Sequence, residues 1–155
     1  MRALWLSAVL AFGIDQLSKL VVVHLMELKH LLVIQVLPPF LVFRMGWNEG
    51  VNFGLLSGAN ARWLLVALAI VICGFLIRWA RGFQRPIALV AAGLVVGGAV
   101  ANALDRVIYG AVADFLNMSC CGFQNPYAFN LADVFIFAGA FGLVIWADAD
   151  QKKTP

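Results

Sequence analysis

Charged side chains are scarce in this chain of 155 residues: only 12% are Asp, Glu, Lys or Arg, and 63% are hydrophobic. An ordinary soluble domain has about 25% charged and about 45–50% apolar residues. A soluble fold of this size could not bury so much apolar surface, because small domains leave a large share of their surface exposed. The composition therefore excludes a typical soluble domain and predicts a membrane protein.

Metal ligands and basic runs are also sparse. The chain has two histidines and three cysteines, of which Cys120 and Cys121 are adjacent. An odd cysteine count with one adjacent pair is not a disulfide framework, and no Cys/His spacing typical of zinc is present. The longest Lys/Arg run is Lys152-Lys153, so we expect no nucleic-acid partner. We expect neither a metal nor another cofactor.

Four long apolar segments predict transmembrane helices, because about 20 apolar residues cross the hydrocarbon core as a helix. In the first segment Asp15 and Lys19 interrupt the apolar run and no small-residue cleavage site follows, so we expect a retained span rather than a signal peptide. We predict one membrane domain over the whole chain, mainly α-helical. Its four transmembrane helices run approximately over residues 3–25, 61–80, 86–108 and 129–147.

The basic residues outside the spans are distributed unevenly. One side of the membrane receives Arg2, Arg78, Arg81, Arg85, Lys152 and Lys153, and the other side receives Lys29, Arg44 and Arg62. Loops rich in Lys and Arg stay in the cytoplasm. We therefore expect both termini to be cytoplasmic.

The connection over residues 26–60 is long and largely apolar. Its stretch LLVIQVLPPFLVFRM contains β-branched and aromatic residues interrupted by Pro38-Pro39, which predicts two short strands around a turn. Val51–Gly58 is expected to form a short interfacial helix or a loop. We place this small sheet on the non-cytoplasmic surface, partly sunk in the membrane interface.

Ionisable and amide side chains gather at one level of the predicted spans. At about 1.5 Å per residue, Asp15 lies past the midplane of a core about 30 Å thick. A charge in hydrocarbon costs about 2.5–3.5 kcal/mol, so such residues usually face a partner or water. The shared level predicts a polar site near the outer face. The other members are Asn102, Asp105, Arg106, Asp114, Asn130 and Asp133.

Spacing suggests structural roles for several of these groups. Asp15 and Lys19 are four residues apart and can form an ion pair on one helix face. Asp105, next to Arg106, is expected to be a topology or pairing element, and the asparagines to bond between helices. Small residues let neighbouring helices approach closely, as expected here at Gly93, Gly97, Gly98 and Ala99.

Asp114 and Asp133 could act together chemically. Two nearby carboxylates cannot both ionise easily, so one keeps its proton while the other stays charged. The charged acid can take a proton from water while the protonated acid donates one to a peptide carbonyl. The main alternative is a small proton-coupled transporter, because intramembrane acids also form proton relays. A non-catalytic membrane subunit is a further alternative.

Five motifs together resemble the lipoprotein signal peptidase family, signal peptidase II, whose members are aspartic peptidases. Each motif is weak alone, but their order and spacing extend over nearly the whole chain. They are DQLSK (Asp15–Lys19), NEGVNFG (Asn48–Gly54), GGAVANALDR (Gly97–Arg106), VADF (Val112–Phe115) and FNLADVFIFAG (Phe129–Gly139).

The resemblance implies a multi-pass endopeptidase of the bacterial inner membrane with its site near the periplasmic face. It implies cleavage of prolipoproteins before a diacylglyceryl-modified cysteine, contact with membrane lipids, and inhibition by globomycin-type compounds. The strands would form a periplasmic cradle over the substrate. Asn52 departs from the family pattern, which commonly has a small residue there. Motif by motif, the catalytic pair falls on Asp114 and Asp133, and supporting positions fall on Asp15, Asn48, Asn102, Arg106 and Asn130.

Overall fold

The computed structural model describes residues 1–50 and 59–151 and contains four long helices and a small sheet. The expected segment Val51–Gly58, with Asn52, lies outside the described residues. The first long helix, α1, continues as a π-helical turn, η1, before the short helix α2, which the sequence did not suggest. The bounds are α1 Arg2–Lys19, η1 Leu20–Leu25, α2 Leu28–Leu31, α3 Ala59–Ala80, α4 Pro86–Tyr109 and α5 Leu131–Gln151.

Three of these helical stretches are long and apolar enough to cross a membrane, and a shorter apolar stretch covers Leu131–Ala147. Their outward faces expose large apolar side chains, for example Phe75 on α3 and Phe137 and Val144 on α5. A large exposed apolar surface of this kind is unfavourable in water and is typical of a protein surface that contacts lipid. The helices therefore confirm a mainly α-helical membrane protein, with element bounds close to those expected from the sequence.

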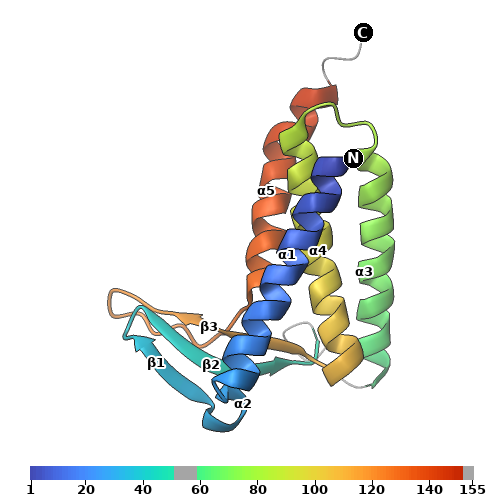
Figure 1. Ribbon diagram of the computed structural model, residues 1–155. Helices are drawn as coiled ribbons and strands as arrows, with labels where there is room; N and C mark the ends of the chain where they lie inside the picture. The colour runs from blue at the N-terminus through green and yellow to red at the C-terminus, as the bar shows by residue number, and fades with distance from the viewer. Residues whose placement is uncertain (51–58, 152–155) are drawn as a thin grey trace.

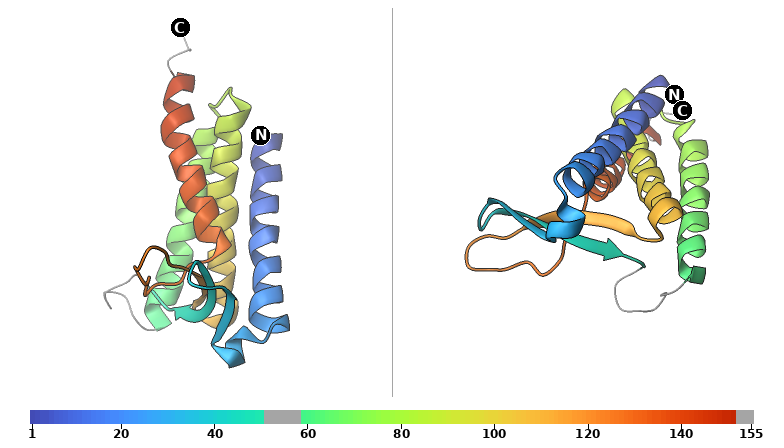
Figure 2. Two further views of the ribbon diagram at one scale, coloured as in Figure 1. Left: turned by 90° about the vertical axis from the view of Figure 1, so that its left-hand side faces the viewer. Right: turned by 60° about the horizontal axis from the view of Figure 1, so that its bottom comes forward.

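Helix α4 packs against α1, α3 and α5 and so forms the centre of the bundle (Figures 1 and 2). The expected glycine contacts are confirmed on two of its sides. A Cβ atom on Gly97 would collide with the carbonyl oxygen of Ala8 on α1, and one on Gly98 would lie 2.5 Å from that of Ala132 on α5. The backbones therefore approach too closely for any larger residue.

The sheet lies at the end of the bundle opposite Met1 (Figure 1). It contains β1 (Val33–Leu37), β2 (Leu41–Asn48) and β3 (Val112–Met118), antiparallel and in the order β1-β2-β3. The first two strands confirm the hairpin expected around Pro38-Pro39.

The spans expected over residues 86–108 and 129–147 leave Asp114 in the connection between them, where no strand was predicted, and the strand β3 corrects this expectation. Instead Asp114 lies opposite Gly46 on β2. On one face of the sheet, Ala113 and Phe115 pack with Val22 and Val23 of η1. The sheet is thereby fixed to the end of α1, and β3 enters the bundle directly after α4.

Candidate active site

Asp114 lies between two amide donors. The Asn130 Nδ2 donates to its Oδ1 at 2.6 Å, and the Asn48 Nδ2 donates to its Oδ2 at 3.2 Å. The side chain is 6% exposed. Burial first, and then the negative charge of Asp133, raise the pKa of Asp114 from 3.8 to about 6. Asp114 therefore holds a proton more readily than an ordinary aspartate.

Asp133 sits in the first turn of α5 and takes part in a capping box. The Asn130 Oδ1 accepts the Asp133 backbone N–H at 3.0 Å, and Asp133 Oδ2 accepts the Asn130 N–H at 3.2 Å. This reciprocal pair satisfies amide groups that a helix start leaves free. Asn130 was expected inside the first turn of the span, whereas it immediately precedes the helix.

Two residues of α4 complete the surroundings of the acid pair. The Asn102 Nδ2 donates to Asp133 Oδ1 at 2.9 Å. Arg106 donates from Nη1 to the Asn102 carbonyl oxygen at 3.3 Å and interacts electrostatically with both Asp114 and Asp133. Its buried Nε has no hydrogen-bond partner among the described residues. Arg106 lies on α4, the same helix whose Asn102 donates a hydrogen bond to Asp133.

A second group of charges, Asp15, Lys19 and Asp105, lies behind the acid pair and is called here the closed cluster. The Lys19 Nζ is 2.7 Å from Asp15 Oδ2 and 2.6 Å from Asp105 Oδ2. All three side chains are buried, and the Gln16 amide also donates to Asp105 at 2.9 Å. The expected pairing of Asp15 with Lys19 is confirmed, and Asp105 is the second carboxylate on the same cation.

The closed cluster also holds the backbone next to each acid of the pair. Asp15 Oδ1 accepts the N–H of Ala132, one residue before Asp133, at 2.8 Å. Asp105 Oδ2 accepts the N–H of Ala113, one residue before Asp114, at 3.2 Å. Lys19, which bridges the two carboxylates, therefore links α5 to β3 through buried charge-assisted bonds.

All seven residues expected at the site thus lie in one connected network. Asp114, Asn48 and Asn130 meet directly, Asn102 and Arg106 reach the pair from α4, and Asp15 acts through the backbone of Ala132. The sequence interpretation expected Lys19 and Asp105 to be pairing elements but missed their ion pair with each other and their connection to the acid pair. Their signal was the placement of a lone cation one turn from Asp15, at the same membrane level as Asp105.

An apolar groove of about 530 Å³ opens beside Asp133 along the outer face of α5. Its walls contain Val134, Phe137 and Ala138, together with Phe129 just before the helix. A groove of this kind suits acyl chains or an apolar helix. It brings such a ligand to the edge of the acid pair.

The protein is a helical bundle with an apolar outer surface, and two carboxylates at one end accept hydrogen bonds from asparagine amides. This arrangement is that of an integral membrane enzyme. Residues 7–148 match the family model described as signal peptidase (SPase) II. The chain belongs to the signal peptidase II family and is therefore a hydrolase, a protease of lipoprotein processing.

Relatives agree with this membership over most of the chain. A protein from Aeromonas hydrophila named lipoprotein signal peptidase is 41% identical, over 99% of this chain and 92% of its own length. One of the same name from Methylobacterium sp. (strain 4-46) is 39% identical, over 88% of this chain and 84% of its own length. A bacterial membrane enzyme solved by the in meso method superimposes with a TM-score of 0.80 at 27% identity, covering 99% of this chain and 93% of that one.

Proposed function

We propose that this protein is an aspartic endopeptidase that removes the signal peptide from prolipoproteins, cutting on the N-terminal side of a diacylglyceryl-modified cysteine. The observation that carries the proposal is the acid pair. Asp114 and Asp133 come from different elements and are held by different amide donors, and burial, followed by the negative charge of Asp133, raises the pKa of Asp114. Paired carboxylates of unequal acidity are the requirement of this chemistry.

In the proposed reaction Asp114 is the acid and Asp133 is the base. Asp133 takes a proton from water, whose oxygen attacks the scissile carbonyl carbon, while Asp114 donates its proton to the carbonyl oxygen. Asp133 then passes its proton to the leaving nitrogen as the C–N bond of the resulting diol breaks, and a hydroxyl proton of the diol returns to Asp114. Each acid has gained one proton and lost one, so the starting charge state is restored. No cofactor enters these steps.

The supporting residues receive distinct roles in this proposal. Asn48 and Asn130 orient Asp114, Asn102 orients Asp133, and Asp15 holds the start of α5. Arg106 interacts electrostatically with both acids, and its guanidinium would stabilise the negative charge that develops on a substrate carbonyl.

We also propose that all four long helices cross the bacterial inner membrane, with both termini cytoplasmic and the acid pair near the periplasmic face. Support comes from the fold, because Met1 lies at the opposite end of the bundle from the sheet (Figure 1). Among the buried polar side chains that the structure describes, Ser7 alone lies in the half near Met1. A proton relay would need such groups through the full thickness, which favours a surface-accessible protease over a transporter.

The test is cleavage of a purified prolipoprotein, with or without its diacylglyceryl group, by the detergent-solubilised enzyme. We expect cleavage of the lipidated precursor only, blocked by globomycin. Asp114→Asn and Asp133→Asn should each lower kcat at least about a thousandfold, because each removes a reacting carboxyl group. The control Glu27→Gln, at an exposed carboxylate, should retain activity. Substantial cleavage by either aspartate variant would contradict the assignment of the pair.

A further inference from the structure

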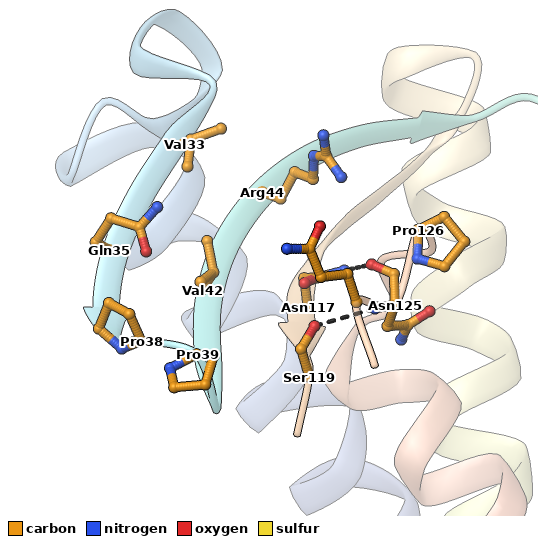
Figure 3. A pocket seen from close by; sticks show the side chains of 11 residues that line it. Val33, Gln35, Pro38, Pro39, Val42, Arg44, Asn117, Ser119, Asn125 and Pro126 are labelled. Atoms are coloured by element: carbon orange, nitrogen blue, oxygen red, sulfur yellow. Dashed lines mark hydrogen bonds between the residues drawn. The ribbon is translucent and has the colours of Figure 1, made fainter. Parts of the chain in front are cut away.

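A polar pocket of about 460 Å³ lies on the sheet and is separate from the apolar groove (Figure 3). The strands form its floor, the turn between β1 and β2 forms one end, and the segment after β3 forms a wall. The side chains shown include Gln35, Val42, Arg44, Asn117, Ser119 and Asn125. Arg44 has no role in the acid pair, and the pocket is a specific site within the strands that the resemblance implies as a cradle over the substrate.

The pocket and Asp114 share one face of the sheet. Successive side chains of a strand point to opposite faces. On β2, Phe43 and Met45 pack toward η1, so Arg44 between them points the other way. On β3, Ala113 and Phe115 also pack toward η1, and Asp114 between them points away. Arg44 and Asp114 therefore look toward the same side.

The register sets how far the pocket lies from the acid pair. Asp114 lies opposite Gly46, and Arg44 is two residues along β2 from that glycine. The pairing shifts between Phe43 and Gly46, and the adjacent Phe115 and Leu116 both pack with η1, so the alternation is interrupted there. Asn117, opposite Val42 and three residues beyond Asp114, therefore lines the same pocket as Arg44. At about 3.3 Å per residue these positions are roughly 7–10 Å along the strands from Asp114. An extended peptide leaving the acid pair would reach them after two to four residues.

Hydrogen bonds hold the wall of the pocket against the end of β3. Asn117 is buried, and its Nδ2 donates to the carbonyl oxygens of Asn125 at 2.7 Å and of Tyr127 at 2.8 Å. The Ser119 hydroxyl accepts the Asn125 N–H at 3.1 Å, as Figure 3 shows. The remaining amide groups along the floor and wall, such as Gln35, can both donate to and accept from a peptide backbone.

The charge of the pocket has one sign. Arg44 is exposed, and none of the lining residues is acidic. The structure shows no salt bridge to Arg44 within residues 1–50 and 59–147. A single cation among amides fits a polar peptide better than a multiply charged anion, which is usually held by several cations.

We propose that this pocket binds the peptide segment that follows the cleaved bond, and that Arg44 makes the enzyme favour acidic over basic side chains two to four residues beyond that bond. The inference rests on the proposed peptidase function. A signal peptide would occupy the apolar groove along α5. The mature segment would then have to leave the membrane over the sheet, where the pocket lies.

The experiment uses three diacylglyceryl-modified precursors that differ only in carrying Asp, Gln or Lys at those positions. The kcat/KM of the wild-type enzyme should be about three- to tenfold higher for the Asp than for the Lys precursor, the size of an exposed ion pair and its repulsive counterpart. Arg44→Glu should invert the order of the Asp and Lys precursors, and Arg44→Gln should abolish the difference between them. Added salt should weaken the preference.

The matched control is Lys29→Glu, which reverses an exposed charge on α2 outside the pocket and should leave the preference intact. An equal kcat/KM for all three precursors with the wild-type enzyme would overturn this inference alone. A uniform loss for all three with Arg44→Glu would also overturn it and indicate another ligand, such as a lipid headgroup. Failure of the wild-type enzyme to cleave any precursor would overturn the proposed function itself.

Discussion

The closed cluster and the acid pair each contain two aspartates at the same end of the bundle, but the two groups differ in the partners that contact their carboxylates. In the closed cluster a single ammonium group lies within 2.7 Å of both carboxylates. In the acid pair every described hydrogen-bond donor to the side-chain oxygens is an amide, from Asn48, Asn102 or Asn130.

The difference shows how partner type separates structure from chemistry. A cation in direct contact favours the charged form of a carboxylate, and removing one partner of a buried ion pair is strongly destabilising. An amide donor orients a carboxylate but supplies no compensating charge, so the group can still gain and lose a proton. Four aspartates are expected at one depth in the membrane, and the groups that contact each aspartate decide whether it can act as an acid or a base.

Removing the cation breaks the closed cluster and should have the largest effect on stability. In Lys19→Met two buried carboxylates lose their counter-charge, a change that typically costs about 3–5 kcal/mol. We expect a large fall in the thermal midpoint of the detergent-solubilised protein and loss of cleavage, because the backbones before both acids lose their link. Lys19→Arg should recover part of both losses.

The matched control for this change is Ser7→Ala, a buried polar residue on the same helix that donates to the Val90 carbonyl oxygen at 3.1 Å. It should lower stability by only about 1 kcal/mol and leave kcat near that of wild type. A thermal midpoint in Lys19→Met equal to that of wild type would refute the assigned role of Lys19.

Displacing the helix that carries Asp133 should disturb the acid pair and the Asp15 bond to Ala132 while leaving the ion pairs of Lys19 in place. In Gly98→Val the new side chain would meet the Ala132 carbonyl oxygen and Ile136, so the start of α5 must shift. A displacement of about 1 Å can cost a hundredfold in rate, and we expect kcat for prolipoprotein cleavage to fall by about that factor. Gly74→Val, on α3 where a Cβ meets nothing within 4 Å, should be near neutral. Equal rates for the two variants would contradict this account.

Removing one amide donor to Asp114 should have the smallest effect on activity. The effect is measured as a shift of the pH dependence of kcat. The Asn48 bond favours ionised Asp114 and so lowers its pKa, while burial and Asp133 raise it. Asn48→Ala should therefore raise that pKa, and Asp114 would keep its proton up to a higher pH. The high-pH limb of the kcat profile should move upward by about half a unit to one unit.

Exposed Gln35 offers the matched control, because Gln35→Ala removes an amide on the same sheet away from Asp114. Its profile should overlay that of wild type. The other charges that interact with Asp114 or lie beside it, Lys19, Arg106 and Asp133, stay in place in both variants. A downward shift for Asn48→Ala would show that its amide does not stabilise the charged form.

Much of the fold could be predicted because membrane helices depend on local composition. The four apolar segments, the hairpin around Pro38-Pro39 and the close approach at Gly97 and Gly98 all follow from residues near one another in sequence. The capping box was not predicted, although Asn130 and Asp133 have the spacing of a helix N-cap and its third residue.

The remainder depended on contacts between distant segments. The strand that carries Asp114 forms only because β2, more than 60 residues earlier, lies beside it, and VADFLNM has weak strand alternation of its own. The link from Lys19 to Asp105 joins α1 to α4, and spacing within one helix could not reveal it. The motif resemblance selected Asp114 and Asp133, whereas the geometry explains how they are held.

The two acids are also joined by a chain segment whose two ends are hydrogen-bonded to each other at Phe115, Leu116 and Phe129, a contact called here the neck. Phe129 accepts the N–H groups of Phe115 and Leu116 through its carbonyl oxygen, and its own N–H returns to the Leu116 carbonyl oxygen at 2.9 Å. Beyond that neck the chain reaches an exposed turn at Cys121 and Gly122, the latter with a φ of +82°. We therefore expect an insertion at Cys121-Gly122 to be tolerated, because the neck rather than the turn connects the backbones that carry the two acids.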